Sequence, residues 1–305
     1  MCINSAMQLL IKLLAIILTF TCILSPIAYE CLVAILGASP WPFSRVFDRV
    51  ILVVLLPIIL IYRKRINLAD LLAYFKVGSK NQRLVLISKG LILALLSGLV
   101  LLPLVVGGSG PLVWNMPATP NILWRIIKIL PAAILIACIE EAIFRLFIFR
   151  TLARLTSLFS AAIISSAFYS FIHFVGPDKS FVYPGYSFLL GFNYLVTIFQ
   201  NALGLEYLYS MLGLFLVGMV LCYAFVASGS IYLSIGLHAG WVMLIKFITF
   251  TTDTRAGFEF AGVLARRYYI LSEPLAWCSF LLVMIAIKLF SHVNSKLPSG
   301  LVQNN

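Results

Sequence analysis

The chain has 305 residues, of which 62% are hydrophobic and only 10% are charged, and its mean hydropathy is +1.07. A soluble globular protein carries about 25% charged residues, so this composition excludes a surface that faces water over most of its area. It also excludes disorder, which requires low hydrophobicity and high net charge. Because a membrane-spanning helix takes roughly 20 apolar residues, we predict an all-α, polytopic integral membrane protein with little structure outside the bilayer.

The net charge of +12 has an ordinary explanation in such a protein. Seven Lys and Arg residues lie between Arg63 and Lys89, and only one acidic residue, Asp70, accompanies them. Basic loops of membrane proteins stay in the cytoplasm, so 63–89 is predicted to be a cytoplasmic loop and the N-terminus to be cytoplasmic as well. Its expected partner is anionic membrane lipid, and no nucleic-acid partner is expected.

Apolar runs that approach the length of a membrane span recur along the whole chain. They lie at 9–28, 46–62, 84–106, 122–149, 156–175, 186–203, 207–227, 230–250 and 274–290. The run 186–203 contains Asn193, Gln200 and Asn201, so it is either a span or a re-entrant or interfacial segment. The sequence therefore predicts a transmembrane helical bundle with eight or nine spans.

In the apolar run 122–149, the segment 132–149 contains three charged side chains, Glu140, Glu141 and Arg145. Each charge at the centre of a bilayer costs roughly 2.5–3.5 kcal/mol on insertion scales, and a functional role is the default hypothesis for it. Glu141 and Arg145 are four residues apart on one helix face and are predicted to pair. Glu140 lies about 100° further around the helix, so we expect it to remain available for proton transfer. The alternative is a buried ion network without chemistry.

Two of the three histidines, His173 and His238, also lie in apolar runs. With a turn near residue 155, antiparallel helices would place Glu140 and His173 at similar depths, roughly 22 and 27 Å from that turn. We therefore expect these two side chains to converge, whereas the spacing does not place His238. Trp241, one turn after His238, is predicted to pack the helix or to line a pocket.

A metal site is a second interpretation of the same residues. The sequence has no H-E-x-x-H motif of the zinc metalloproteases. Glu140, His173 and His238 could nevertheless bind a divalent metal such as zinc from separate helices, and that metal would activate a water molecule. The only Asp within these runs is Asp48, at the third position of 46–62, so an intramembrane aspartyl protease is not expected.

Three motifs together resemble the CPBP family, which comprises the CAAX prenyl endopeptidases of the Ras-converting type and related bacteriocin-processing or immunity membrane proteins. The motifs are E-E-x-x-x-R from Glu140, 168-FYSFIH-173 and 235-IGLHAGW-241, and the resemblance covers about residues 130–245. It implies an all-helical intramembrane protease without a required cofactor. By matching position, Glu140 and His173 would activate the attacking water, Glu141 and Arg145 would support them, and His238 would stabilise the oxyanion.

The chain departs from the family pattern at two positions. Val242 stands four residues after His238, where the family has an Asn that helps to hold the oxyanion, and Tyr169 stands where Phe is usual. Losing one oxyanion donor can cost about 10²–10³ in rate. The candidates for a substrate or oxyanion pocket are Tyr169, Trp241 and Asn193.

These observations predict an intramembrane endopeptidase that hydrolyses a peptide bond of a membrane-associated or lipidated, CAAX-like substrate. The alternatives are a non-proteolytic immunity or scaffold protein that keeps the motif as a binding pocket, and a proton-coupled carrier, although no internal duplication is evident. We divide the chain into N-terminal transmembrane helices with the basic loop (1–121), a CPBP-like catalytic core (122–250), and a C-terminal loop, last helix and tail (251–305).

Overall fold

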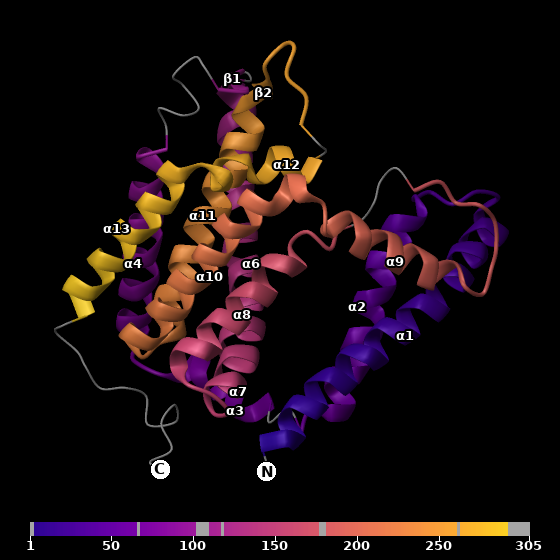
Figure 1. The fold of residues 1–305 in the computed structure, drawn as a ribbon, viewed down its shortest axis with the longest axis horizontal. Helices are drawn as coiled ribbons and strands as arrows, with labels where there is room; N and C mark the ends of the chain where they lie inside the picture. Colours follow the sequence, from indigo (N-terminus) through magenta and orange to yellow (C-terminus); the bar gives the residue numbers. More distant parts are fainter. Residues whose placement is uncertain are drawn as a thin grey trace. The chain divides into compact units, whose positions relative to one another are not determined.

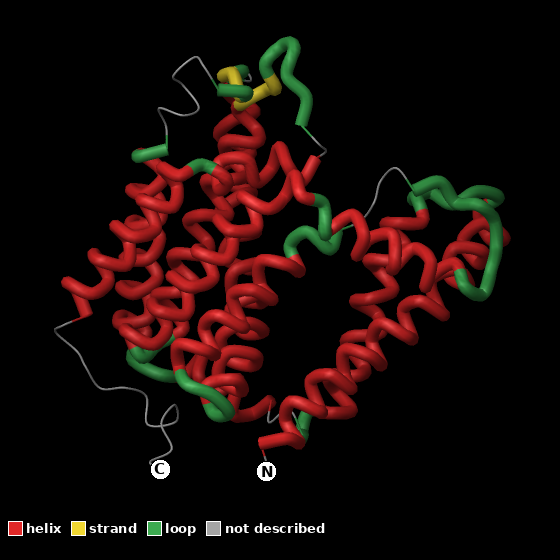
Figure 2. The backbone as a smooth tube through the Cα atoms, in the orientation of Figure 1, coloured by secondary structure: helices red, strands yellow, loops and turns green. Residues whose placement is uncertain are grey.

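The computed structural model describes residues 3–65, 68–101, 110–116, 119–176, 181–260 and 263–291. Most of them are helical, and loops and turns connect the helices (Figure 2). The β-structure of the described residues is a two-stranded antiparallel ladder in which β1 (Leu112–Trp114) pairs with β2 (Thr252–Thr254). The prediction of a helical protein is therefore confirmed, with this small ladder as an addition that the sequence did not predict.

The chain forms two compact units, which are described separately. Unit 1 combines Met1–Asp70 with Phe171–Leu205, and unit 2 combines Leu71–Ser170 with Glu206–Asn305. The helices of unit 1 are α1 (Ile3–Leu36), α2 (Phe43–Tyr62) and α9 (Leu190–Ala202). Those of unit 2 are η1 (Tyr74–Lys76), α4 (Lys80–Leu99), α6 (Thr119–Glu141), η2 (Ala142–Phe149), α7 (Arg150–Ala153), α10 (Leu208–Ser228), α11 (Ile231–Thr251), α12 (Val263–Tyr268), η4 (Tyr269–Ser272) and α13 (Pro274–Ser291). Three helices cross the boundaries, namely α3 (Leu68–Ala73), α8 (Leu158–Ile172) and η3 (Leu205–Tyr207).

Aromatic rings fill the core of unit 1. Phe43 and Phe47, one turn apart on α2, meet the ring of Tyr194 on α9 with centroids 5.3 and 5.0 Å away. Helix α9 also lies against α1 without a side chain between the backbones, because a Cβ at Gly191 would lie 2.0 Å from the carbonyl oxygen of Cys22. Glycine at position 191 is therefore required by this packing.

Helix α11 is the centre of unit 2 and packs against α4, α6 and α10, while α13 packs against α4 and α10 (Figure 1). Its contact with α4 is a backbone contact. A Cβ at Gly236 would lie 2.2 Å from the carbonyl oxygen of Ile87, and one at Gly90 would lie 2.5 Å from that of Leu233. Small residues of this kind let helices approach closely in membranes, where burial of apolar surface provides little driving force for helix association.

The number of spans differs from the prediction. Each of the nine apolar runs contains a helix, but among the described residues only five helices are long and apolar enough to cross a membrane, or six if the bent pair Leu264–Ser272 and Pro274–Leu289 counts as one. Helices α8 and α9 have 15 and 13 residues, short of the roughly 20 that a span requires. Helix α2 has three charged residues in its first two turns. Eight or nine spans are therefore not confirmed.

The α4–α11 contact generates a first prediction. Gly236→Ala should lower the free energy of unfolding by about 1–3 kcal/mol, because the new methyl group meets backbone that cannot move aside cheaply. Gly98→Ala is the matched control, since its Cβ meets only the end of the flexible Leu244 side chain. Unfolding of both variants in detergent measures the difference, and equal losses would contradict a rigid backbone contact.

Candidate active site

The two glutamates lie where a regular helix changes its hydrogen-bonding pattern. Helix α6 ends at Glu141, and the next eight residues form the π-helix η2, Ala142–Phe149. π-helical turns are rare and often occur at functional sites. Glu141 and Arg145 are completely buried, whereas 27% of the Glu140 side chain is exposed. Of the two side chains, that of Glu140 is therefore the one partly open to solvent, while its Oε2 atom is itself buried.

The Glu141 carboxylate contacts two cationic or potentially cationic groups at once. One oxygen, Oε2, lies 3.2 Å from Nε of Arg145, so the ion pair expected from the four-residue spacing is present. The other oxygen, Oε1, lies 3.0 Å from Nδ1 of His238 on α11. A single carboxylate therefore links α6, η2 and α11.

His238 lies between the two glutamates. Its Nδ1 faces Glu141, and its Nε2 lies 3.6 Å from Oε2 of Glu140. A separation of 3.6 Å is too long for a direct hydrogen bond. Only 3% of the imidazole is exposed. The ring orientation is set by Glu141, as second-shell carboxylates orient catalytic or metal-binding histidines, and it directs Nε2 toward Glu140.

Tyr169 is the second group at Nε2 of His238, after Glu140. Its hydroxyl lies 3.4 Å from Nε2 of His238, and its ring is nearly perpendicular to the imidazole. The Arg145 guanidinium lies over the Tyr169 ring, with Cζ 5.2 Å from the ring centroid. Phe144 meets the same ring edge-on, with the two centroids 4.9 Å apart. These contacts fix the tyrosine on α8 beside the histidine.

Hydrogen-bonding capacity identifies the donor between Glu141 and His238. A carboxylate paired with Arg145 only accepts hydrogen bonds, so Nδ1–H of His238 donates to Oε1 of Glu141 at 3.0 Å. Nε2 of the same ring then points to the space beside Glu140 and Tyr169.

Trp241 serves the packing of α11. Its indole N–H donates to the hydroxyl of Ser97 on α4 at 3.0 Å, and its ring meets Phe280 on α13 edge-on at 5.4 Å. Val242, four residues after His238, lies on the same face of the helix as that histidine. It offers no polar group where the family pattern has an amide.

The other predicted site residues belong to unit 1. His173 follows α8 directly, and Asn193 is exposed on α9. His173 and Asn193 lie in unit 1 and Glu140 lies in unit 2. The predicted meeting of His173 with Glu140 therefore stays a prediction, as does a pocket role for Asn193. No group of three or more His, Cys, Asp and Glu side chains suited to a metal ion occurs among the described residues. Metal binding by Glu140, His173 and His238 likewise stays a prediction.

Sequence reasoning missed the contact between Glu141 and His238. It assigned Glu141 to Arg145 alone and left His238 without a partner. The formal charges of the run were a usable signal, because two glutamates and one arginine leave one negative charge that a third basic group must balance. The hydroxyl partner of Trp241, Ser97, had no comparable signal in the sequence.

The double role of Glu141 generates a second prediction. Glu141→Gln should cost about 3–5 kcal/mol of folding free energy, since it leaves a buried arginine without its counter-charge. Glu140→Gln is the matched control, because 27% of the Glu140 side chain is exposed, whereas Glu141 and Arg145 are completely buried. Unfolding of the two variants in the same detergent gives the comparison, and a Glu141→Gln protein as stable as the control would contradict the assignment.

One comparison with known protein families matches the part of the chain that contains this cluster. Residues 122–244 match the model of a family described as type II CAAX prenyl endopeptidase Rce1-like, and this range includes both glutamates, Arg145, Tyr169, His173 and His238. No curated protein and no solved structure matches the chain. Together with the long apolar helices, the match supports an integral membrane protein. The resemblance to the CPBP family that the three motifs predict is therefore confirmed over residues 122–244.

Proposed function

We propose that the protein is an intramembrane endopeptidase of the CPBP type, in which Glu140 activates a water molecule for attack on a peptide bond. The observation that carries the proposal is the buried cluster in which Glu141 holds the imidazole of His238 so that Nε2 faces Glu140. Hydrolysis requires a base for the water and a donor for the oxyanion. Glu140 and His238 supply these two groups side by side.

The proposed reaction has two steps. Glu140, assisted by His173, takes a proton from water as the water oxygen forms a bond to the carbonyl carbon, and the carbonyl π electrons move to oxygen. Nε2–H of His238 donates to the resulting oxyanion. The oxyanion then re-forms the carbonyl double bond as the carbon–nitrogen bond breaks. Glu140 returns the proton to the departing amine nitrogen, which regenerates the Glu140 carboxylate.

Tyr169 is proposed to supply the oxyanion donor that Val242 cannot provide. Its hydroxyl lies 3.4 Å from Nε2 of His238, so both donors address the same space. Its ring is clamped by Arg145 and Phe144, and a donor that is already positioned loses little free energy to reorganisation during the reaction. The usual Phe of the family would leave this position without a hydroxyl.

The substrate is proposed to be a membrane-associated or lipidated peptide of the CAAX type. This part of the proposal follows the description of the matching family, because a fold does not determine a substrate. The side-chain exposure of Glu140 within a long apolar helix suits a peptide that arrives through the membrane. We place the protein in the membrane as a multi-pass protein whose N-terminus is cytoplasmic.

Val242 favours one alternative, a non-proteolytic immunity or scaffold protein whose cluster is only a binding pocket. A proton-coupled carrier would use Glu140 and His173 as a relay, with protonation rather than cleavage as its output. Reconstitution of the full chain with membrane-tethered peptides, including a farnesylated CAAX peptide, separates these functions. Reproducible cleavage of any of these peptides excludes both alternatives. If none of the membrane-tethered peptides is cleaved, the proposed function is overturned.

A third prediction concerns the base. Glu140→Gln should lower the rate of peptide cleavage by about 10²–10⁴-fold with unchanged folding, because an amide cannot accept the proton from water. Glu259→Gln, an exposed loop residue, is the matched control and should cleave at the full rate. Full activity of Glu140→Gln would remove Glu140 from the mechanism. His173→Ala in the same assay tests the assisting role, and a chelator tests for a metal.

A fourth prediction concerns the oxyanion donor. Tyr169→Phe should lower kcat by about 10²–10³-fold with little change in KM, because the lost donor acts mainly in the transition state. Adding Val242→Asn to that variant should restore part of the rate by placing an amide on the same helix face as His238. An unchanged kcat in Tyr169→Phe, with the fold verified by its unfolding midpoint, would exclude Tyr169 as a donor.

A further inference from the structure

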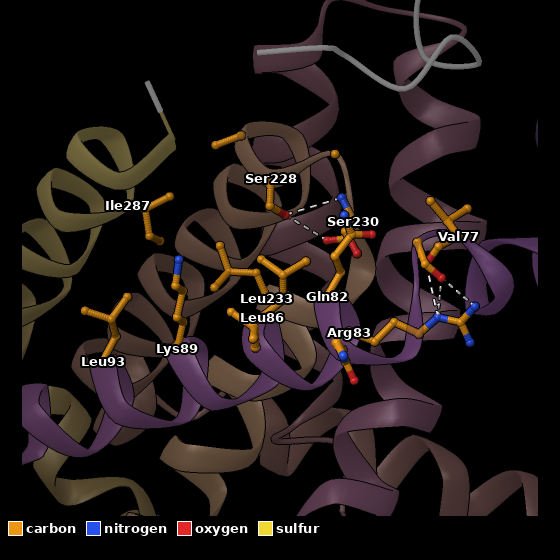
Figure 3. Close-up of a pocket in the computed structure, with 15 residues that line it drawn as sticks. Val77, Gln82, Arg83, Leu86, Lys89, Leu93, Ser228, Ser230, Leu233 and Ile287 are labelled. Carbon is orange, nitrogen blue, oxygen red and sulfur yellow. Dashed lines mark hydrogen bonds between the residues drawn. The ribbon is translucent and has the colours of Figure 1, made fainter. Parts of the chain in front are cut away.

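Unit 2 contains a cavity on the side of α11 that packs on α4, apart from the glutamate and histidine cluster. It has a volume of about 470 Å³, and 15 described residues line it, from the turn before α4, from α4 itself, from the turn between α10 and α11, and from α13 (Figure 3). None of these residues is acidic. The volume lies in the range of small-molecule sites, so the lining chemistry decides what the cavity can hold.

The last ten residues of the predicted loop 63–89 belong to helix α4, which is a candidate membrane span. The cavity therefore contains a lysine, Lys89, inside such a span. Lys89 is exposed and lies nine residues beyond the first residue of α4, which corresponds to roughly 14 Å along the helix axis. Figure 3 shows its ammonium group beside the apolar side chains of Leu93 and Ile287. Within the described part of the chain, no hydrogen bond or ion pair involves Lys89. A cation at such a depth normally pairs with another group.

Two polar side chains of the cavity lining, Arg83 and Ser228, already donate hydrogen bonds to backbone carbonyls. The Arg83 guanidinium donates to the backbone carbonyls of Lys76, Val77 and Gly78 and so fixes the turn before α4. On the other side, Ser228 donates to the carbonyl of Ala224. Lys89 is therefore the cation in the lining whose donors are not used within the described residues.

We propose that this cavity binds an anionic phospholipid, with its phosphate at the Lys89 ammonium and the start of an acyl chain along Leu93 and Ile287. Charge complementarity supports this occupant, because the lining contains two basic residues, Arg83 and Lys89, and no acidic residue. The apolar side chains of Leu93 and Ile287 lie on the same side of the cavity as Lys89 (Figure 3). Basic pockets between transmembrane helices are known to bind anionic headgroups. A zwitterionic lipid would bring a second cation next to Lys89 and is disfavoured.

The test uses the purified full-length protein in detergent micelles that contain equal amounts of dioleoyl phosphatidylglycerol and dioleoyl phosphatidylcholine. Native mass spectrometry measures how much of each lipid remains bound. The wild-type protein should retain phosphatidylglycerol in preference, and Lys89→Met should lower that preference roughly fivefold, the factor expected for one cation near the lipid phosphate. Lys80→Met, an exposed residue of the same helix outside the cavity, should leave the preference unchanged.

A second variant separates this site from diffuse attraction to a basic surface. Leu93→Trp keeps every charge but fills part of the cavity, so it should also reduce lipid retention. The proposal is overturned if Lys89→Met behaves like the wild type, if Lys80→Met has the same effect as Lys89→Met, or if Leu93→Trp retains the lipid fully. Displacement of the lipid by millimolar inorganic phosphate would also overturn it, because the site would then bind a small anion.

Discussion

The contacts of the Glu141 carboxylate are the interactions on which unit 2 depends. The carboxylate is completely buried, and its two oxygens contact Arg145 in η2 and His238 on α11. Taking a carboxylate out of water is costly unless partners surround it, so both contacts must persist as long as the helix stays buried. The position of Tyr169 then follows, because the guanidinium that Glu141 holds lies over the tyrosine ring. Three separate segments are thereby fixed around one imidazole.

The backbone contact between α4 and α11 serves the same site from the opposite side. Gly236 and Gly240 are two residues before and after His238, and two residues correspond to a rotation of roughly 200° on a helix. The glycines therefore face α4, where a Cβ at Gly240 would lie 2.5 Å from the Cβ of Ala94, while the histidine faces α6. Close packing on one face of α11 limits how far the imidazole on the other face can move away from the glutamates.

Local features of the site were predictable from the sequence, and long-range ones were not. The pairing of Glu141 with Arg145 depends only on a spacing of four residues within one helix. The contact of Glu141 with His238 joins residues 97 positions apart and requires α11 to pack on α6, which no periodicity reveals. The same distinction explains the span count. Apolar composition correctly located a helix in every run, but the ends of α8 and α9 depend on turns and packing that hydropathy does not encode.

The proposed lipid site and the proposed catalytic site share one structural element. Lys89 directly precedes Gly90, where a Cβ would lie 2.5 Å from the carbonyl oxygen of Leu233 and 2.6 Å from the backbone nitrogen of Leu237, immediately before His238. A phosphate bound at Lys89 would therefore lie next to the part of α4 that contacts α11 just before His238. The two proposed sites are therefore joined by the backbone contact at Gly90, and protein interiors transmit displacements rather than absorb them.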